Sequence, residues 1–259
     1  NFLTFLTLLL CLLTRRRAFI KIANSGKNFD LKLFFNRLYP LKLFKKIFDS
    51  QLFTFLCLNT ENEDDFSKFG MKNVHLVPFR NGVMSVHNKE NIKNYKKIMY
   101  LGRLEPIKNV DYIFDLADLM HDFEFIVVGD GSCFEHLNRL STRHGNVRLI
   151  GETTVENIPW SQIEWIILPS LAEGMSNVLL EALANQKGIL CRPIEANLFL
   201  GAICEKLVWI SDDQELTASK IRSLTGAPSI MNEGFSYFEI GSVVSDLRNI
   251  IAENKRIGS

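Results

Sequence analysis

Two cations stand close together in a segment with the features of a phosphate-binding loop. Gly102-Arg103-Leu104 directly follows the apolar run Met99-Tyr100-Leu101, and Lys108-Asn109 comes shortly after it. In a sheet of parallel strands, the loops at the carboxyl ends of the strands form the ligand crevice. Arg103 and Lys108 on such a loop could neutralise a diphosphate, because both side chains are cationic at neutral pH. On this motif alone, two solvated surface cations are an equally good interpretation.

A second segment, 168–184, leads from a predicted strand through a glycine-containing loop into an apolar helix pattern. Ser176 stands just before that pattern and belongs to the residue types that cap helices. The first amides of a helix have no intrahelical acceptor and attract anions. We therefore predict that the N–H groups of Asn177 and Val178 face the crevice.

The same segment carries two carboxylates. Glu173 lies on the loop, and Glu181 lies more than one turn down the predicted helix. This separation would let one carboxylate reach a sugar while the other reaches a ribose. Solvated glutamates on a surface helix are the simpler alternative, but the apolar neighbours Leu180 and Ala182 make it a poor fit for Glu181,.

A third strand-to-turn segment, Val127-Val128-Gly129-Asp130-Gly131, superficially resembles the GxGxxG dinucleotide fingerprint. The third glycine of that fingerprint would have to stand at position 134, where the sequence has Phe134,. A nicotinamide-dependent dehydrogenase is therefore disfavoured. Gly129 and Gly131 are instead predicted to let the chain turn sharply beside the ligand.

Charge is distributed unevenly along the chain of 259 residues. The first 60 residues contain ten Lys and Arg and two acidic residues, a net charge of +8 in a chain whose total is +1. A basic, aromatic-rich segment of this kind indicates contact with an anionic surface, either nucleic acid or anionic lipid. The composition, 47% hydrophobic and 23% charged, is ordinary for a globular protein,.

The chain begins with Asn and an apolar run from Phe2 to Leu13, which Arg15-Arg16-Arg17 follows. A run of about twelve residues is too short to span a bilayer, and the basic cluster stands on the wrong side for a signal peptide. We interpret the run as the tail of a buried helix in a chain truncated at its N-terminus. The five scattered cysteines form no CxxC pair, which indicates buried reduced thiols,.

Short apolar runs rich in Ile, Val and Phe alternate with helical patterns, most regularly from about residue 97 onward. This alternation predicts βαβ units, a parallel sheet and a doubly wound α/β domain. The predicted strands are Ala18–Ala23, Leu52–Leu58, Val74–Pro78, Lys97–Leu101, Glu124–Val128, Val147–Ile150, Trp165–Leu168, Gly188–Cys191 and Leu207–Ile210. The predicted helices are Val110–His121, Cys133–His144, Asn177–Asn185 and Asp213–Leu224.

The pattern before residue 90 is different. Residues 29–48 are aromatic and basic and are interrupted by Pro40, which predicts two short helices,. The polar stretch 81–95 is typical of a linker,. We therefore divide the chain into a partial N-terminal Rossmann-like domain over 1–90, a second Rossmann-like domain over 91–238 and a C-terminal helix over 239–259.

In this order, the segments resemble the group 1 glycosyltransferases, also called glycosyltransferase family 4. Glu173-Gly174 through Glu181 matches the E-x7-E signature of the family, residues 102–109 match its GRL…KN loop, and residues 129–131 match its GxG turn. Asn24-Ser25-Gly26-Lys27 is similar to a loop of the acceptor domain, and residues 77–83 are similar to the interdomain segment. The resemblance runs from about Asn59 to the C-terminus and is strongest over 97–186.

The resemblance implies the GT-B fold, in which two Rossmann-like domains with parallel sheets face each other. Residues 1–90 would then be an incomplete acceptor-side domain, and residues 91–238 would bind a nucleotide sugar.

It also implies roles for the site residues. Arg103 and Lys108 would neutralise the donor diphosphate, so that neither a metal nor another cofactor is expected. Glu173 would contact the donor sugar near the reacting carbon, and Glu181 would accept hydrogen bonds from the ribose. The N–H groups of Asn177 and Val178 would hold the distal phosphate. The remaining positions expected to contact the donor are Gly102, Gly129, Gly131, Gly174, Met175 and Ser176.

The implied enzyme is a retaining glycosyltransferase. It would move a sugar from a nucleoside diphosphate sugar, UDP-linked in most of the family, to a glycan or lipid-linked acceptor in cell-surface polysaccharide or lipopolysaccharide synthesis. It would be cytoplasmic and peripheral on the inner membrane face, with residues 15–48 against anionic lipid. The alternative places the aromatic residues in a core and leaves the lysines solvated. Nucleic acid is not an expected partner, because no nucleic-acid-binding module accompanies the charge.

The sequence departs from the family pattern in two places. The N-terminal domain lacks the first strands of the family, with a Gly-rich loop and a His that face the donor. This departure keeps open the alternative of a non-catalytic, nucleotide-sugar-binding remnant. After Gly188–Cys191, residues 192–197 read Arg-Pro-Ile-Glu-Ala-Asn where the family often has Gly-Gly, which leaves the donor sugar open.

Overall fold

The computed structural model describes residues 10–11, 13–22, 49, 52–57, 62–83, 96–154, 157–158, 160–227 and 238–256. The chain divides into two units, Asn1–Asn81 and Gly82–Ser259. Each unit is described by itself. The division falls at the start of the polar stretch 81–95, most of which lies outside the described residues.

The first unit contains a parallel sheet with the strand order β1-β2-β3. Its elements are β1 (Ala18–Ile22), β2 (Phe53–Cys57), α4 (Asn62–Phe69) and β3 (His75–Pro78). All five residues of β2 are buried, because a central parallel strand is covered on both faces,. Phe55 of this strand packs against Phe66 of α4, with the ring centroids 4.6 Å apart.

The second unit is built on a sheet of six parallel strands in the order β6-β5-β4-β7-β8-β9. The strands are β4 (Lys97–Leu101), β5 (Glu124–Val128), β6 (Val147–Gly151), β7 (Trp165–Leu168), β8 (Gly188–Cys191) and β9 (Leu207–Trp209). The chain starts at the centre with β4, builds outward to β6, and returns to the other side of β4 with β7. The sheet is therefore doubly wound, and its topological switch point lies between β4 and β7.

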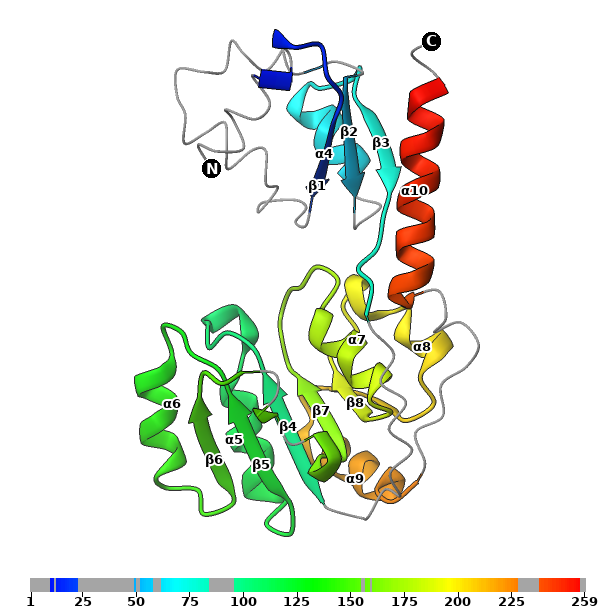
Figure 1. Ribbon diagram of the computed structural model, residues 1–259. Coiled ribbons are helices and arrows are strands. Elements are labelled where there is room, and N and C mark those ends of the chain that lie inside the picture. The colour runs from blue at the N-terminus through cyan, green and yellow to red at the C-terminus, as the bar shows by residue number, and fades with distance from the viewer. Residues whose placement is uncertain are drawn as a thin grey trace. The chain divides into compact units, whose positions relative to one another are not determined.

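Helices cover both faces of this sheet (Figure 1). They are α5 (Asp111–Leu119), α6 (Phe134–Ser141), α7 (Asn177–Ala184), α8 (Leu200–Ile203) and α9 (Gln214–Leu224), and α10 (Ile240–Arg256) follows them. Right-handed crossovers that run in opposite directions from the centre place their helices on opposite faces. Accordingly, α5 packs against α6 and α9, whereas α7 packs against β7 and β8.

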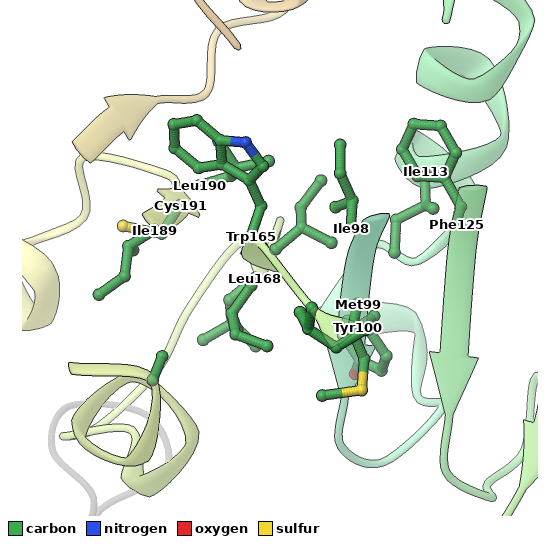
Figure 2. Packing of buried hydrophobic residues seen from close by; sticks show 14 of the residues in the cluster. Ile98, Met99, Tyr100, Ile113, Phe125, Trp165, Leu168, Ile189, Leu190 and Cys191 are labelled. Atoms are coloured by element: carbon green, nitrogen blue, oxygen red, sulfur yellow. The ribbon is translucent and has the colours of Figure 1, made fainter. Parts of the chain in front are cut away.

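The core of the second unit consists of the inner strands and the helix faces packed on them (Figure 2). Every residue of β7 and β8 is buried. Ile98 of β4 stands opposite Trp165 of β7 in the strand register. Gly188 on the next strand makes room for this indole, because a Cβ there would lie 2.3 Å from the ring.

A buried ion pair closes the amino ends of the strands. Lys206 precedes β9 and lies 2.8 Å from Glu164, which precedes β7, and the two side chains are 2% and 0% exposed. The Lys206 ammonium also donates to the Ala227 carbonyl and lies 4.8 Å from the centroid of the Trp165 ring. Glu164 accepts a further hydrogen bond from the Gly226 amide. Hydrogen bonds of this kind compensate the cost of burying two charges.

The described elements confirm the predicted α/β class with parallel sheets. The strands β4, β5, β7 and β8 have the predicted bounds. Each of the other strands differs from its predicted bounds by one residue, at one end or at both. The helices α4 and α8 had no counterpart in the predicted elements. The predicted loop 24–27 and the predicted helices of 29–48 lie outside the described residues, as does most of the apolar run 2–13, of which Leu10, Cys11 and Leu13 are helical.

The described part of the chain has no helix that combines the length and the apolar character needed to cross a membrane. The cysteines are free thiols. Cys57, Cys191 and Cys204 are buried as predicted, whereas Cys11 and Cys133 are only half-buried. Burial raises the pKa of Cys191 to about 12 and that of Cys204 to about 11. Both thiols therefore stay protonated and unreactive near neutral pH.

Candidate functional site

The candidate site lies at the switch point of the six-stranded sheet. The loop that follows β4 and the loop that follows β7 leave the same edge of the sheet, because the two strands are parallel neighbours. The Leu171 amide donates a hydrogen bond of 2.9 Å to the Ile107 carbonyl and so joins the two loops. The carboxyl ends of the strands at a switch point are the usual place for ligand sites in doubly wound sheets.

Lys108 and Glu173 meet where the two loops join. The Lys108 ammonium lies 2.5 Å from a carboxylate oxygen of Glu173, and the two side chains are only 15% and 11% exposed. Lys108 ends the 3-10 helix η3 (Pro106–Lys108), and Asn109 follows it with a left-handed φ of 51°. The two residues that the sequence predicts to act on one ligand are therefore in direct contact.

Arg103 is exposed on the turn between β4 and η3. The hydroxyl of the buried Tyr100 donates a hydrogen bond of 2.7 Å to the Arg103 carbonyl. Burial raises the pKa of Tyr100, the Glu173 carboxylate raises it further, and the Arg103 guanidinium lowers it. Both charged groups thus act on one buried hydroxyl.

Gly129 and Gly131 pack against the backbone of the Arg103 turn. A Cβ on Gly129 would lie 1.8 Å from the Gly102 carbonyl oxygen, and a Cβ on Gly131 would lie 2.5 Å from that of Leu104. Hydrogen bonds from the Gly102 amide to Val128 and from the Leu104 amide to Asp130 complete this contact. The glycines are therefore required by the neighbouring turn, and their predicted contact with a ligand stays a prediction.

Glu105 and Ser132 hold the same two turns together from the outside. The Glu105 carboxylate accepts hydrogen bonds from the Ser132 hydroxyl at 2.7 Å and from the Ser132 amide at 3.3 Å. These bonds lower the pKa of Glu105. The loops after β4 and β5 thus form one connected structure.

Ser176 occupies the N-cap position of α7, as the sequence predicts, but its side chain makes no capping hydrogen bond. The expected side-chain cap is therefore absent, although the Ser176 carbonyl accepts the first backbone hydrogen bond of the helix from the Leu180 amide,. The amides of Asn177 and Val178 belong to the first turn, where no intrahelical acceptor exists,. Gly174 and Met175 are half-buried on the loop that leads to them.

Glu181 is half-buried on α7 between the buried side chains of Leu180 and Ala182. Burial raises the pKa of its carboxyl group, and no charged group in the described part of the chain offsets that effect. A carboxylate in such surroundings has unused capacity to accept hydrogen bonds. This environment agrees with the prediction that Glu181 is more than a solvated surface residue.

The loop 192–197, which replaces the Gly-Gly of the family pattern, is tied to the carboxyl end of β7. The Arg192 guanidinium donates to the Pro169 carbonyl at 3.1 Å and pairs with Asp212 at 2.9 Å. It also lies over the Tyr112 ring, 5.6 Å from the centroid. Asn197 donates to the Arg192 carbonyl and fixes the other end of the loop.

Tyr100 and Arg192 were not singled out as functional from the sequence. Tyr100 lies in an apolar strand, where a tyrosine is an ordinary core residue. The replacement of the family's Gly-Gly by residues 192–197 was the sequence feature that pointed to Arg192. Its partners Pro169, Asp212 and Tyr112 come from three segments that are distant in the sequence. Only the fold brings those segments together.

The described residues contain no group of three or more His, Cys, Asp or Glu side chains that could hold a metal ion. Asp212 is engaged by Arg192, and Asp213 caps α9 through the Leu216 amide at 2.9 Å. Asp64 and Asp65 belong to α4 of the first unit.

Comparison with known proteins gives one family match. A sequence model described as "Glycosyl transferases group 1" matches residues 95–225. No curated protein sequence matches the chain.

Solved structures with a similar fold include S. aureus TarM in complex with Fondaparinux, alpha-GlcNAc-glycerol and UDP, with a TM-score of 0.67 and 15% identity over 90% of this chain and 50% of TarM. Anabaena HepE in complex with UDP-glucose matches with a TM-score of 0.66 and 14% identity, over 95% of this chain and 75% of HepE. The lipopolysaccharide outer core galactosyltransferase WaaB matches with a TM-score of 0.56 and 17% identity, over 77% of this chain and 62% of WaaB. At such identities the similarity shows the fold alone, and the chain spans half the length of TarM.

Proposed function

The chain belongs to the group 1 glycosyl transferases, whose sequence model matches about half of it, and on that premise we propose that it is a retaining glycosyltransferase. It transfers a sugar from a nucleoside diphosphate sugar to a glycan or a lipid-linked acceptor. The observation that carries the proposal is the contact between Lys108 and Glu173 at the switch point, beside the Arg103 turn.

The donor is proposed to be UDP-linked. UDP or UDP-glucose is bound in the TarM and HepE structures, which share the fold of this chain. The similarity to WaaB, a lipopolysaccharide galactosyltransferase, supports a role in lipopolysaccharide or cell-surface polysaccharide synthesis.

The diphosphate is assigned to Arg103, Lys108 and the first amides of α7. Arg103 presents an exposed guanidinium, and Lys108 is held at the joined loops. Two cations and the positive end of a helix stabilise the charge that develops on the leaving diphosphate. Lys108 exchanges part of its contact with Glu173 for the phosphate, which leaves the Glu173 carboxylate beside the sugar.

In the transfer step, the bond between the anomeric carbon and the diphosphate oxygen breaks, and its electron pair stays on that oxygen. The acceptor oxygen bonds to the same face of the anomeric carbon, so that configuration is retained. The acceptor proton passes to the leaving phosphate. Glu173 stabilises the positive charge that builds up on the sugar ring, and Glu181 accepts hydrogen bonds from the ribose hydroxyls.

Transfer is proposed to need no metal, because Arg103 and Lys108 supply two positive charges at the diphosphate. The test is transfer from a radiolabelled UDP-sugar with and without EDTA. Equal rates support the proposal, and loss of transfer that Mg²⁺ or Mn²⁺ restores contradicts it.

Arg103→Ala tests the diphosphate role directly. We expect kcat/KM for the donor to fall about 100-fold, the effect of removing one charge-stabilising group at a transition state. Arg148→Ala is the matched control, because Arg148 is an exposed arginine on β6 that pairs with Glu124. Unchanged turnover in Arg103→Ala would remove the diphosphate assignment.

The alternative is a protein that binds nucleotide sugars without transferring them. Saturation-transfer NMR with UDP and UDP-sugars detects binding in either case, whereas only the enzyme transfers or hydrolyses the sugar.

The protein is proposed to act in the cytoplasm, at the inner membrane face, through its basic residues 15–48. That segment contains ten Lys and Arg, from Arg15 to Lys46. Co-sedimentation with vesicles of anionic lipid tests this proposal. Binding that salt weakens supports it, and absence of binding or binding insensitive to salt contradicts it.

A further inference from the structure

Tyr100 lies directly beneath the turn that presents Arg103. It is the fourth residue of β4, its side chain is 0% exposed, and it belongs to the core shown in Figure 2. Its hydroxyl donates to the Arg103 carbonyl at 2.7 Å, which is a normal length for a hydrogen bond from a hydroxyl,. A buried hydroxyl thus reaches out of the core to the backbone of an exposed residue.

Gly102 allows the turn to fold over this hydroxyl. A Cβ at position 102 would lie 3.1 Å from the Tyr100 oxygen, and the φ of Gly102 is +155°. Other residues rarely adopt this conformation. The glycine therefore gives the hydroxyl room to reach the carbonyl of the next residue.

The other contacts of the turn lie on either side of Arg103. The Gly102 amide donates to the Val128 carbonyl at 3.1 Å, and the Leu104 amide donates to the Asp130 carbonyl at 2.8 Å. The peptide between Arg103 and Leu104 is thus held by Tyr100 on its carbonyl and by Asp130 on its amide. This peptide sets the direction in which the Arg103 side chain leaves the backbone.

The Glu173 carboxylate, which contacts Lys108, also raises the pKa of Tyr100, whereas the Arg103 guanidinium lowers it. Both charged groups of the candidate site thus act electrostatically on the Tyr100 hydroxyl.

We propose that Tyr100 is a positioning residue, whose hydroxyl fixes the Arg103 backbone so that the guanidinium meets the donor diphosphate. This inference rests on the proposed function, and the experiment below separates the failure of one from the failure of the other.

The test begins with Tyr100→Phe in the full chain, with the dissociation constant of UDP measured by titration calorimetry. The ring stays in the core, and only the hydrogen bond is lost. We expect UDP to bind about threefold to tenfold more weakly, as for the loss of a single hydrogen bond that orders a charged side chain. The unfolding temperature is measured in parallel to establish that the variant folds.

Tyr112→Phe is the matched control. Tyr112 is a buried tyrosine of α5 in the same unit, and its hydroxyl donates to the Ser211 carbonyl at 2.9 Å. The variant loses a buried hydroxyl away from the Arg103 turn. We expect its affinity for UDP to equal that of the original protein.

A double-mutant cycle decides between positioning and general stabilisation. If Tyr100 acts through Arg103, Tyr100→Phe has no further effect on UDP binding once Arg103→Ala is present. If the two effects multiply, Tyr100 acts independently of Arg103 and the inference is wrong. An effect of Tyr112→Phe as large as that of Tyr100→Phe would also overturn it.

Two further outcomes are informative. If the original protein binds none of UDP, GDP and ADP, the proposed function fails and the inference fails with it. If Tyr100→Phe does not fold, the cycle is run with Gly102→Ala, whose Cβ displaces the hydroxyl without removing it. If Gly102→Ala weakened UDP binding as much in the Arg103→Ala background as in the original protein, the positioning role would be rejected.

Discussion

At the scale of single residues, the contact between Lys108 and Glu173 joins a cation and an anion that we propose to serve opposite ends of the donor. Lys108 is assigned to the diphosphate, and Glu173 is assigned to the sugar. Because each side chain is at least 85% buried in the pair, neither is hydrated freely. Their mutual attraction keeps both charged groups in place. Glu173 then competes with the donor phosphate for the Lys108 ammonium.

Glu173→Gln removes this competition. We expect UDP, which lacks the sugar, to bind as tightly as before or severalfold more tightly, because Lys108 is no longer neutralised. Sugar transfer should fall by about 100-fold, since the charge that stabilises the sugar ring is lost. Titration calorimetry and a radiolabelled transfer assay measure the two effects.

Lys108→Met is the complementary variant, and it should weaken both UDP binding and transfer. If Glu173→Gln weakened UDP binding as much as Lys108→Met, Glu173 would serve only to hold Lys108. The assignment of Glu173 to the sugar would then be wrong.

Glu181 gives the site a dependence on pH. Burial raises the pKa of this carboxyl in the folded protein, so the folded state binds more protons than the unfolded state between the two pKa values. The free energy of unfolding contributed by this group therefore falls as pH rises through that interval.

Glu181→Gln removes the buried charge. We expect a higher unfolding temperature than that of the original protein at about pH 7.5, and a smaller difference as the pH falls toward the carboxyl pKa. The same variant should bind UDP more weakly at every pH. If Glu181→Gln and the original protein had the same unfolding temperature at every pH, burial of the charged Glu181 carboxylate would not destabilise the fold.

At the scale of elements, the two turns after β4 and β5 fit together through their glycines. Gly129→Ala places a Cβ 1.8 Å from the Gly102 carbonyl at a φ of +143°, so the turn that carries Arg103 must move. We expect loss of about 1–3 kcal/mol in the free energy of unfolding and UDP binding at least tenfold weaker. Urea unfolding and calorimetry measure these quantities.

Gly145→Ala is the matched control, because a Cβ at this exposed glycine meets no atom within 4 Å. Its effect on stability should stay within about 0.5 kcal/mol. An equally mild effect of Gly129→Ala would show that the two turns are not tightly packed.

Much of the element pattern could be predicted from the sequence. The strands β4, β5, β7 and β8 are short apolar runs covered on both faces, and their ends were predicted to the residue. Helix ends were predicted less well. For example, α5 ends at Leu119, two residues before the predicted end at His121, and the buried Met120 and Phe123 then lead the chain into β5.

The loops of the candidate site were predicted in position but not in contact. The residue types of Arg103, Lys108 and Glu173 and their places after strands indicated a shared ligand. The close approach of Gly129 to Gly102 and the three contacts of Arg192 depend on tertiary neighbours. No spacing along the chain encodes them, so the sequence could not reveal them.

At the scale of the whole molecule, the six-stranded sheet separates chemistry from stability. The loops of the candidate site leave the carboxyl ends of the strands, whereas Glu164 and Lys206 form their buried pair at the amino ends. The strand β7 separates Glu164, at its amino end, from the loop with Glu173 that follows its carboxyl end. The ion pair therefore has no contact with the proposed donor.

Lys206→Ala should therefore affect folding alone. We expect the free energy of unfolding to fall by about 3–5 kcal/mol, because Glu164 keeps a buried charge without its cation. Below the unfolding transition, the affinity for UDP should not change. Urea unfolding and calorimetry at low temperature test the two parts separately.

Lys96→Ala is the control for Lys206→Ala. It breaks an exposed ion pair with Asp122 in the same unit, where the side chains are 45% and 48% exposed. It should lower the free energy of unfolding by less than about 1 kcal/mol. If Lys206→Ala also weakened UDP binding, the two ends of the sheet would be coupled.

The interlocked turns after β4 and β5 also have a consequence for redesign. Since the carbonyl oxygens of one turn occupy the space of the missing side chains of the other, the two turns have to be exchanged as a single cassette. A chimera that imports the Arg103 turn from a relative without its companion would bring together mismatched surfaces. Libraries aimed at a different donor should recombine both turns and keep the strands constant.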